Sequence, residues 1–465
     1  MKYCNEKFLV FGLKSSGAEC VEFLLSKNAL VGIFDENEEA LASETCRKLL
    51  LKGAVIACDT DNADKSEETP NDRFSSIYDY DVVVVSPGVP ADNKILVKLK
   101  RLKKRILGEL ELAYLNCKAP VIAISGTNGK TTVSTAVHEA LTKSGETCYL
   151  LGNVGVPFIK YADDTLQTDL CVVEVSSFQL ETINQFTPHV AVMLNVTEDH
   201  LDRHYTMDNY VYLKKRLFKN QRESEWAVLN YDDETVRSFA SDLRSKIVWF
   251  SRKEKVDGAY IRDGFVYYRD EKITAVSDLS LKGAHNEENF LACVCALKTV
   301  GTSSECIVKC FSNVKGLPFR TENVGEYNGV TYYNDSKSTN VDSTLKAMES
   351  IDKPTVLILG GRSKNQDFTP IFKAIKEGNG KIKHVILTGE SRFSMLEDSL
   401  NLKIYDVSVV SDLLSAVRLA KSTAEEGDAV LFSPATASFD AFKDYVDRGE
   451  KFNYLVRGLN EEKCD

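Results

Sequence analysis

The sequence has no run of about 18 apolar residues, which is roughly the length that a membrane-spanning helix needs. Its first residues, Met1 to Leu13, have neither a long apolar core nor a small-residue cleavage site, so they do not read as a signal peptide. Internal repeats of solenoid period and low-complexity tracts are missing as well. We therefore expect a protein without a membrane segment that works in the cytoplasm.

An excess of basic residues is also missing. The 465 residues include 58 Lys and Arg against 68 Asp and Glu, which gives a formal net charge of −10. Binding to nucleic acid requires a basic face, so we expect no nucleic-acid partner. A small anionic substrate remains compatible with this charge, because a local pocket can be basic on an acidic protein.

The twelve cysteines include no Cys-x-x-Cys pair. Cys293 and Cys295, like Cys306 and Cys310, lie in apolar stretches that are typical of helices. Packing in a core explains such cysteines much better than zinc binding does. Scattered cysteines of this kind fit a reducing cytoplasm.

What the sequence does have is a glycine turn between a predicted strand at Val121–Ile124 and a predicted helix at Val133–Leu141. The turn reads Ser125-Gly126-Thr127-Asn128-Gly129-Lys130-Thr131-Thr132. Backbone N–H groups and the positive end of a helix hold phosphate oxygens at such turns. Lys130 would neutralise the β- and γ-phosphates of ATP, and the Thr131 hydroxyl would reach Mg²⁺. The string is one residue shorter than the usual P-loop, and the alternative is an ordinary glycine-rich turn.

The length predicts about three domains, and we place them at residues 1–107, 108–316 and 317–465. The first opens with a predicted strand at 8–11, the glycine turn Gly12–Gly17, a helix and a second strand at 30–34. This βαβ unit is Rossmann-like. In the third domain predicted strands alternate with helices, which indicates a parallel, doubly wound α/β sheet.

Local patterns predict further elements of the chain. Asp263-Gly264 between two apolar runs is a strong signal for a two-residue hairpin turn. Polar composition around Pro70 indicates a long surface loop. The predicted elements are the loop 59–81, a basic helix 94–105, strands at 148–151, 170–175 and 190–194, a helix 209–222, the hairpin 260–268, a helix 289–300, strands at 330–333, 355–359, 384–388 and 429–432, and helices at 343–351, 370–376, 412–424 and 437–447.

Glu174 closes a buried run that should lie beside the strand leading into the phosphate loop. A carboxylate at that strand end suits a nucleotide-bound Mg²⁺. The alternative is that Glu174 is an acid in the first turn of the next helix. A bare buried carboxylate is costly without a cation, which favours the metal.

The string from Asn195 to His204 is dense in side chains that bind ligands. His200 could hold a second Mg²⁺, and Arg203 could meet a phosphate. Taken alone, the string reads as a solvated, charged loop. Its place after a third parallel strand of the same domain points it to the same cleft and favours a ligand site.

Polar strings also follow three predicted strands of the third domain. Asp335 would serve the nucleotide, while Lys337 and Thr339 would serve an anion. Arg320, at the join of the second and third segments, is a candidate contact of the γ-phosphate. Each string alone could be a helix cap. Together they indicate a pocket for a small anionic substrate, since ligands bind at the carboxyl ends of parallel strands. The strings are Asn334–Asn340, Gly360–Lys364 and Ser433–Ser438.

These motifs, in this order, resemble the Mur ligases of bacterial peptidoglycan synthesis. The resemblance covers nearly the whole chain, and within the family it is strongest to the member that adds D-glutamate. It implies a three-domain α/β enzyme with an N-terminal Rossmann-like UDP-binding domain, a central P-loop ATPase-like domain with a parallel sheet, and a C-terminal Rossmann-like domain that binds the amino acid. The motifs are Gly126–Thr132, Glu174-Val175-Ser176-Ser177-Phe178-Gln179, Asn195 with Asp199-His200-Leu201-Asp202-Arg203, His285-Asn286, Asn334–Asn340 and Ser433–Asp440.

The resemblance also implies roles for single residues. ATP would be bound by Gly126, Thr127, Asn128, Gly129, Lys130, Thr131, Thr132, Asn286, Asn289, Arg320 and Asp335. The UDP substrate would be bound by Ser15, Ser16, Asp35, Gly88, Asn153, Ser176, Gln179 and His200. One Mg²⁺ would be held by Thr131 and Glu174, and a second by His200 and Lys214, the lysine that this family carbamylates with CO₂. D-Glutamate would be surrounded by Lys337, Thr339, Lys364, Ser438, Phe439 and Tyr445. The catalytic set would be Lys130, Glu174, His200, Lys214 and Arg320.

Three features depart from the family pattern. Phe319 stands where the family has a histidine before the arginine. Lys14 replaces a glycine in the N-terminal turn, and Glu36 and Asn37 replace a Thr-Arg pair after the acid, so uridine recognition differs in detail. The loop at 59–81 is longer than usual and has no assigned role.

The implied reaction joins D-glutamate to UDP-N-acetylmuramoyl-L-alanine by way of an acyl phosphate, in a monomeric enzyme. The nearest rival is folylpolyglutamate synthase, which shares the phosphate loop but begins with its ATPase domain. A rival of another class is a nucleotide switch without ligase chemistry. The amino-acid pocket predicted in the third domain argues against a switch.

Overall fold

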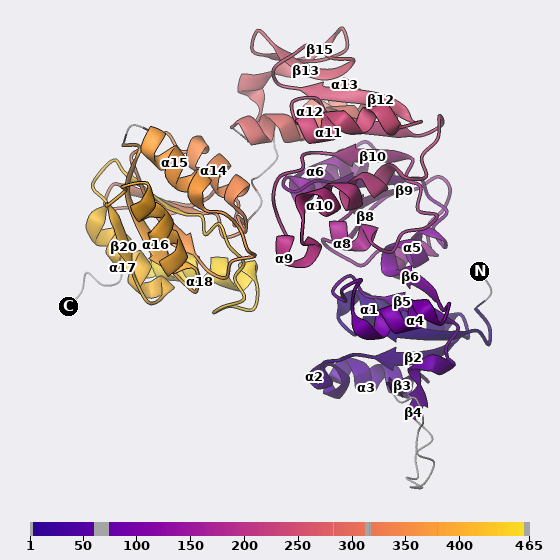
Figure 1. The fold of residues 1–465 in the computed structure, drawn as a ribbon. Helices are drawn as coiled ribbons and strands as arrows, with labels where there is room; N and C mark the ends of the chain where they lie inside the picture. The colour runs from indigo at the N-terminus through magenta and orange to yellow at the C-terminus, as the bar shows by residue number, and fades with distance from the viewer. Residues whose placement is uncertain are drawn as a thin grey trace. The chain divides into compact units, whose positions relative to one another are not determined.

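The computed structural model describes residues 3–59, 74–281, 283–311, 316, 318–378 and 380–459, and Figure 1 draws its ribbon. Within this part of the chain the strands form three sheets of six, nine and six strands. Each sheet is dominated by parallel pairs, and helices connect most of its strands. The predicted α/β class with three domains is therefore confirmed.

The first sheet has the strand order β4-β3-β2-β1-β5-β6, and its pairs are all parallel. β1 and β5 are neighbouring interior strands and are rich in buried Val, Leu and Phe, as a parallel sheet covered on both faces requires. The Rossmann-like unit predicted here is present. Its elements are β1 Lys7–Phe11, α1 Ser15–Ser26, β2 Leu30–Phe34, α2 Glu38–Ala42, α3 Glu44–Leu51, β3 Val55–Cys58, β4 Phe74–Ser76, η1 Ile77–Asp79, β5 Val82–Val85, α4 Lys94–Arg101 and β6 Arg105–Gly108.

The second sheet has the order β15-β14-β13-β12-β11-β10-β7-β9-β8. β7, which leads into the phosphate loop, lies between β10 and β9 and is buried along its whole length. The elements up to β11 are α5 Glu109–Tyr114, β7 Val121–Ser125, α6 Lys130–Lys143, β8 Cys148–Gly152, α7 Ile159–Ala162, β9 Leu170–Glu174, α8 Ser177–Leu180, β10 Val190–Met193, α9 Leu201–His204, α10 Met207–Lys215, η2 Arg216–Phe218 and β11 Trp226–Asn230.

The far edge of this sheet contains the predicted hairpin. β13 and β14 pair antiparallel, with Arg262 opposite Phe265. Asp263 and Gly264 have φ values of 51° and 75°, as a two-residue turn of this kind needs. The remaining elements are α11 Glu234–Ser238, η3 Phe239–Asp242, β12 Lys246–Ser251, β13 Gly258–Arg262, β14 Phe265–Tyr268, β15 Glu271–Ala275, η4 Val276–Asp278, α12 Ala284–Thr299 and α13 Ser304–Phe311.

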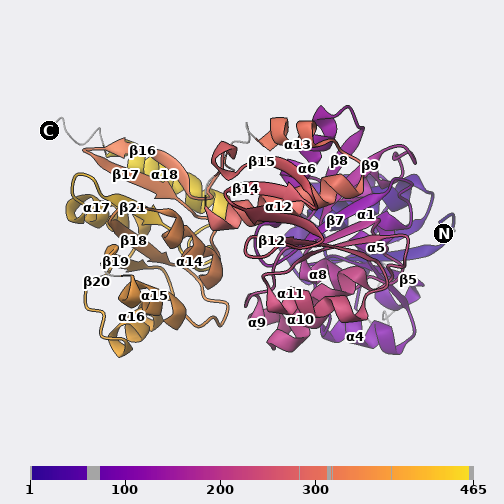
Figure 2. The same ribbon diagram turned by 90° about the horizontal axis from the view of Figure 1, so that it is seen from above.

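The third sheet, with the order β16-β17-β21-β18-β19-β20, is doubly wound (Figure 2). Alternate residues of a strand point to opposite faces, and β18 shows the result. Leu357 and Leu359 pack with α14, α15 and α16, whereas Val356 and Ile358 pack with α17 and α18. The elements are β16 Glu322–Tyr327, β17 Val330–Asn334, α14 Val341–Ser350, β18 Thr355–Gly360, α15 Thr369–Glu377, β19 Ile382–Thr388, α16 Arg392–Asn401, β20 Val407–Val409, α17 Leu413–Thr423, β21 Ala429–Phe432 and α18 Tyr445–Gly458.

Several predicted boundaries were wrong. The helix expected at 94–105 ends at Arg101, and Arg105–Gly108 is a strand, β6. The helix expected at 209–222 ends at Lys215, and the one expected at 289–300 starts five residues earlier, at Ala284. The helix expected at 437–447 is replaced by α18 at Tyr445–Gly458. The predicted loop 59–81 contains β4 and η1, and residues 60–73 of it lie outside the described residues.

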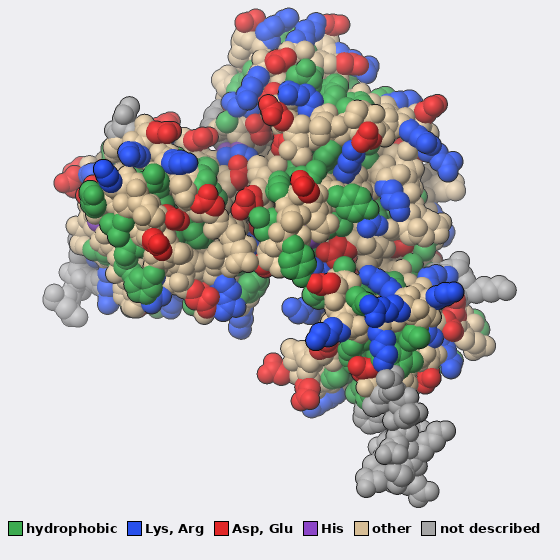
Figure 3. Space-filling view, in the orientation of Figure 1, with side chains coloured by type: hydrophobic (Ala, Val, Ile, Leu, Met, Phe, Trp, Pro, Cys, Tyr) green, Lys and Arg blue, Asp and Glu red, His purple; other side chains and the backbone are tan. Residues whose placement is uncertain are grey.

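The described residues divide into two compact units. The first comprises residues 1–195, 211–274 and 290–310, and the second comprises residues 196–210, 275–289 and 311–465. The predicted domain boundaries at 107/108 and 316/317 stay predictions. In the first unit, basic side chains gather over α4, where Lys94, Lys98, Lys100 and Arg101 lie (Figure 3). No helix in the described ranges is long and apolar enough to cross a bilayer.

Candidate active site

The phosphate loop joins β7 to α6 in the first unit, and two glycines determine its shape. Gly126 and Gly129 have φ values of 157° and 84°, in the region that favours glycine. A Cβ atom on Gly126 would lie 2.9 Å from the Cβ of Leu194. The loop backbone therefore passes too close to the end of β10 for a side chain. The loop leads directly into the N-terminus of the 14-residue helix α6. A glycine turn followed by a helix N-terminus is an arrangement that binds phosphate oxygens.

Asn195, two residues after the end of β10, holds this loop in place. Its backbone carbonyl accepts from the N–H of Thr127 at 2.9 Å, and its side-chain oxygen accepts from the N–H of Asn128 at 2.8 Å. Its side-chain nitrogen lies 3.3 Å from the carbonyl oxygen of Asn128. The sequence placed Asn195 in a ligand-rich string, but its role in holding the loop was not predicted.

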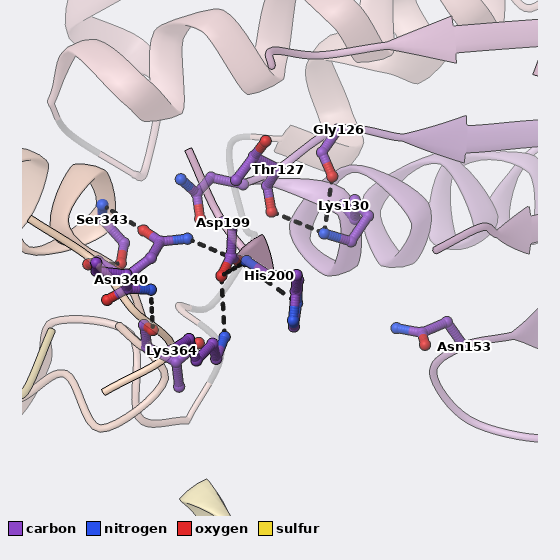
Figure 4. A network of polar contacts seen from close by, with 12 residues as sticks. Gly126, Thr127, Lys130, Asn153, Asp199, His200, Asn340, Ser343 and Lys364 are labelled. Atoms are coloured by element: carbon purple, nitrogen blue, oxygen red, sulfur yellow. Dashed lines mark hydrogen bonds and ion pairs between the residues drawn. The ribbon is translucent and has the colours of Figure 1, made fainter. Parts of the chain in front are cut away.

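Two lysines on different helices donate hydrogen bonds to the loop. Lys130, at the start of α6, donates to the carbonyl oxygens of Gly126 and Thr127 at 2.9 and 2.7 Å, as Figure 4 shows. Lys214, near the end of α10, is 1% exposed and donates to the same Gly126 oxygen at 2.6 Å. The alternative that Lys214 lies on a solvated helix face is therefore wrong. Lys215, by contrast, pairs with Asp242 at the surface.

Glu174 ends β9 beside β7, with Ile124 and Glu174 as partners in the parallel ladder. Its side chain is 1% exposed. One carboxylate oxygen accepts from the side-chain nitrogen of Asn153 at 2.8 Å, while the other is buried and has no hydrogen-bond partner. A buried carboxylate oxygen without a donor is costly unless a cation binds it. Glu174 is therefore suited to bind Mg²⁺.

No group of three or more His, Cys, Asp or Glu side chains that could enclose a metal ion occurs in the described part of the chain. Mg²⁺ does not need such a cage. It usually keeps several waters and binds through one or two carboxylates together with the phosphates of its substrate. A single buried carboxylate such as Glu174, with the hydroxyl of Thr131 at the start of α6, fits this mode of binding.

The four residues expected to bind the UDP part lie at one end of the first sheet. Ser15 and Ser16 form the first turn of α1, Asp35 follows β2, and Gly88 lies on the turn after β5. These strands are parallel, so their carboxyl ends meet. One oxygen of Asp35 accepts from the N–H of Leu13 at 2.6 Å, which ties it to the glycine turn.

Ser176 and Gln179, also expected to bind the sugar nucleotide, form a capping box on α8. The Gln179 oxygen accepts from the backbone N–H of Ser176 at 2.9 Å, and the Ser176 hydroxyl accepts from the N–H of Gln179 at 3.3 Å. Gln179 is 4% exposed. Their contact with substrate stays a prediction, whereas their role in starting α8 is visible.

In the second unit, the buried carboxylate of Asp199 collects three side chains (Figure 4). Lys364 donates to it at 3.0 Å, Asn340 donates at 3.1 Å, and the Nε2 atom of His200 lies at 3.5 Å. Burial alone would raise the pKa of Asp199, but Lys364 and His200 outweigh it and hold that pKa well below its usual range. Lys364 and His200, expected as ligands of D-glutamate and metal, are thus brought together by Asp199.

His200 has a left-handed backbone, with φ 55° and ψ 33°, at the start of α9. Its N–H donates to a side-chain oxygen of Asp199 at 2.8 Å. A left-handed conformation costs a non-glycine residue about 1 kcal/mol or more. The surrounding contacts must compensate for this cost, and residues strained in this way are common at functional sites.

Asp335 is the second buried carboxylate of this unit, 4% exposed at the end of β17. It accepts from the N–H of Thr321 and from the hydroxyls of Ser338 and Ser433. Burial raises its pKa to about 6, against these donors and the nearby charge of Arg320. Arg320 and Asp335, both expected to serve ATP, therefore lie close enough to interact.

The other residues expected around D-glutamate are only partly gathered. The Nζ of Lys337 lies 3.6 Å from the ring centre of Tyr445, and Thr339 accepts through its carbonyl oxygen from Gln366. Ser438 is buried, but Phe439 is 62% exposed. Asn286 and Asn289 stand three residues apart near the start of α12 and share one face of that helix.

Comparison with known proteins identifies the family. Residues 124–297 match the Mur ligase middle domain, and residues 319–436 match the Mur ligase glutamate ligase domain. Full-length relatives include the UDP-N-acetylmuramoylalanine–D-glutamate ligases of Koribacter versatilis, 39% identical, and Alkaliphilus metalliredigens, 37% identical, each over 99% of both chains. The chain belongs to the Mur ligase family.

Solved Mur ligases share the fold across the whole chain. The MurF ligase from Thermotoga maritima in complex with ADP has a TM-score of 0.63 at 16% identity and covers 99% of both chains. MurF from Acinetobacter baumannii has a TM-score of 0.64 at 14% identity and covers 97% of this chain and 93% of that chain. The predicted resemblance to Mur ligases is confirmed.

One residue that organises the second unit of this Mur ligase was missed. Arg448 on α18 is 1% exposed and donates to the carbonyl oxygens of Ser336 and Thr436 and to the hydroxyl of Ser336. Burial lowers its pKa to about 10. It ties two of the predicted strand-end strings to α18. No sequence motif pointed to it, since an arginine on a helix is usually exposed.

Two departures from the Mur ligase pattern have visible consequences. Phe319 has a φ of 62°, and its ring packs against Gly449 of α18, where a Cβ atom would lie 2.4 Å from the ring. An aromatic hydrocarbon thus fills the position at which the resemblance led us to expect a histidine. Lys14 caps α1 with an extended backbone and is exposed. The turn therefore accepts a lysine without strain.

Proposed function

We propose that this Mur ligase joins D-glutamate to UDP-N-acetylmuramoyl-L-alanine, with hydrolysis of ATP to ADP and phosphate, in peptidoglycan precursor synthesis. The observation that carries the proposal is the 39% identity to the D-glutamate ligase of Koribacter versatilis over 99% of both chains. The phosphate loop, with Lys130 folded onto it, supports the proposal, since such a reaction needs a site for the phosphates of ATP.

The reaction requires no nucleophilic side chain. A carboxylate oxygen of the substrate's L-alanine takes the γ-phosphoryl group of ATP and becomes an acyl phosphate. The amine of D-glutamate then attacks the acyl carbon, loses a proton, and expels phosphate. Both transition states are anionic, so we assign charge stabilisation and positioning to Lys130 and Arg320.

We assign Gly126–Thr132, Asn286, Asn289, Arg320 and Asp335 to ATP. Mg²⁺, when bound, would neutralise the phosphate charge that develops during transfer. Thr131 and Glu174 would hold one ion, and His200 and Lys214 a second. The buried, unpartnered oxygen of Glu174 supports the first assignment.

The proposed role of Lys214 requires its carbamylation. The neutral amine adds to the carbon of CO₂ and loses a proton, which turns a cation into an anionic oxygen ligand that Mg²⁺ prefers. An ammonium beside the divalent ion would be repelled. The burial of Lys214 and its contact with Gly126 in the phosphate loop support a role at this site.

We assign the substrates to the two Rossmann-like sheets. Ser15, Ser16, Asp35 and Gly88 would bind the UDP part, with Asn153, Ser176, Gln179 and His200 on the rest of the sugar nucleotide. The two carboxylates of D-glutamate need donors or cations, which Lys337, Thr339, Lys364, Ser438, Phe439 and Tyr445 would surround. The ion pair between Lys364 and the carboxylate of Asp199 supports the assignment of Lys364, since its ammonium group already binds one carboxylate.

The proposal is tested by phosphate release from ATP with each candidate amino acid in turn. We expect release only when D-glutamate and UDP-N-acetylmuramoyl-L-alanine are both present, and none with L-glutamate or diaminopimelate. Release with a folate and L-glutamate would favour the rival folylpolyglutamate synthase. Release without any acceptor would favour a nucleotide switch.

We also propose that the enzyme works as a monomer in the cytoplasm, where its ATP and UDP-linked substrate are found. The described cysteines are free thiols, which is compatible with a reducing compartment. Light scattering on the active enzyme should give the mass of one chain, and a mass of two or more chains at working concentration would contradict the monomer.

A further inference from the structure

Two cysteine thiols lie in contact in the first unit, away from the residues assigned to ATP. The sulfur atoms of Cys117 and Cys171 are 3.8 Å apart. Cys171 is fully buried on β9, whereas Cys117 is partly exposed and follows the end of α5. A disulfide bond is about 2.0 Å long, so these thiols are adjacent and not bonded.

The surroundings of the two thiols favour Cys117 as the attacking thiol and Cys171 as the resolving thiol. A hydrogen bond from the Cys171 thiol lowers the pKa of Cys117, although burial acts in the opposite direction. The hydroxyl of Thr165 lies 3.5 Å from the Cys117 sulfur and also favours its thiolate. The pKa of Cys171 is raised by the bond to Cys117 and by burial. Cys117 is thus both the more exposed and the more nucleophilic of the two.

Both cysteines stand on segments that lead to the candidate active site. Cys117 lies four residues before β7, the strand that enters the phosphate loop. Cys171 lies on β9, the strand that ends at Glu174. The two strands are neighbours, with Val121 opposite Cys171, and the N–H of Cys171 donates to the carbonyl oxygen of Pro120. A covalent bond here would join the two segments that position the phosphate loop and Glu174.

We propose that Cys117 and Cys171 form a site of reversible modification, at which a low-molecular-weight disulfide converts the two thiols into an intramolecular disulfide. The Cys117 thiolate attacks one sulfur of the small disulfide, forms a mixed disulfide and releases one thiolate. Cys171 then loses its proton and attacks the Cys117 sulfur, which releases the second thiolate. The two protein thiols are oxidised and the small disulfide is reduced to two thiols.

Three other cysteines of the same unit are poor competitors for this pairing. Cys293 and Cys295 are fully buried, and burial raises the pKa of each. Cys148 lies on the neighbouring strand β8, but its ladder partner is Leu170. Successive residues of a strand point to opposite faces, so Cys148 and Cys171 face apart. Cys148 therefore serves as the matched control.

The first test treats the reduced full-length protein with oxidised glutathione and maps its peptides by mass spectrometry without reduction. We expect a cross-linked peptide pair that contains Cys117 and Cys171, a mass lower by about 2 Da for that pair, and full reversal by dithiothreitol. Cys148→Ser should form the same bond, while Cys117→Ser and Cys117→Ala should not. Free thiols at both positions, or glutathione retained on Cys117, would overturn the proposal.

The second test measures phosphate release in the same samples, and it rests on the ligase activity proposed above. We expect activity to fall in proportion to the fraction of molecules that carry the bond and to return with dithiothreitol. Cys117→Ala should keep its activity in oxidised glutathione. Full activity at full cross-linking would refute the coupling to the active site. A reduced protein without ligase activity would refute the proposed function and leave the peptide mapping valid.

Discussion

Lys130 and Lys214 donate to one and the same acceptor, the carbonyl oxygen of Gly126, at 2.9 and 2.6 Å. Two ammonium groups that share an oxygen repel each other by about 3 kcal/mol at roughly 5 Å in a partly screened site. Lys214 is the more buried of the two. Its proposed carbamylation would turn one of these two cations into an anion.

The first prediction concerns that lysine. Lys214→Ala should lose nearly all ligase activity with its fold retained, because the proposed second Mg²⁺ would lose its carbamate ligand. Lys215→Ala is the matched control and should lose little, since its ammonium pairs with Asp242 at the surface. Activity and circular dichroism of both variants provide the check.

Carbamylation can also be observed directly. Protein equilibrated with ¹³C-labelled bicarbonate should show a carbamate carbon resonance that disappears in Lys214→Ala and persists in Lys215→Ala. An active wild-type enzyme without this resonance would contradict the proposed modification.

The second prediction concerns Lys130. Lys130→Ala should abolish phosphate release, because the charge assigned to the β- and γ-phosphates is removed from the loop. The loop itself should keep its shape, since Asn195 holds the N–H groups of Thr127 and Asn128. Isothermal titration with ATP and a melting curve separate loss of binding from loss of fold. Near-normal phosphate release from a folded variant would contradict the assignment of Lys130 to the phosphates of ATP.

The third prediction concerns Lys364. Lys364→Ala should raise the KM for D-glutamate by about tenfold or more and leave the KM for ATP nearly unchanged, because a hydrogen bond to a charged group is worth about 1.5–3 kcal/mol. Lys346→Ala, which breaks a half-buried pair with Asp342 within α14, is the control and should change neither constant. Equal effects of Lys364→Ala on both KM values would make Lys364 a structural partner of Asp199.

Local sequence patterns predicted the features that depend on one short segment. Gly126 and Gly129 marked the phosphate loop because the loop needs backbone conformations that favour glycine. Asp263-Gly264 marked the hairpin for the same reason. Glu174 could be placed at a strand end because a buried apolar run precedes it.

Features that depend on distant partners could not be predicted in this way. Asp199 and Lys364 are separated by 165 positions, and nothing local indicates that they pair. The helix expected at 437–447 was wrong for a similar reason. Ala437 instead forms an isolated antiparallel β-bridge with Arg362. The helix begins only at Tyr445, and its Arg448 makes buried hydrogen bonds such as the one to the carbonyl oxygen of Thr436. Tertiary contacts override local propensity at such positions.

The fourth prediction concerns a pair of carboxylates at the start of α5. Glu111 is fully satisfied, since its oxygens accept from the backbone N–H groups of residues 184, 185 and 186. Glu109, 1% exposed, accepts from the N–H of Ile159 with one oxygen, and its other oxygen has no partner. Burial raises the pKa of Glu109 to about 7 and outweighs the nearby donors of Ile159, Phe158 and Gln179, which act in the opposite direction.

The sign of the pH dependence follows from that direction. An unfolded glutamate has a pKa of about 4.3, so between about pH 4 and pH 7 the folded state holds a proton that the unfolded state has released. The stabilising contribution of the protonated Glu109 is complete below about pH 4 and is lost as the pH rises through about 7. Above that range the ionised, buried carboxylate costs about 4 kcal/mol.

Glu109→Gln removes this titration. We expect the free energy of unfolding of the variant, relative to wild type, to rise between pH 5 and pH 8.5 by about 2–3 kcal/mol. Glu111→Gln is the contrasting variant and should be destabilised across the whole range, because its backbone N–H donors lose a charged acceptor. Urea unfolding at pH 5, 6, 7 and 8.5 measures both. A difference between Glu109→Gln and wild type that does not change with pH would show that Glu109 is already ionised in the folded protein at pH 5.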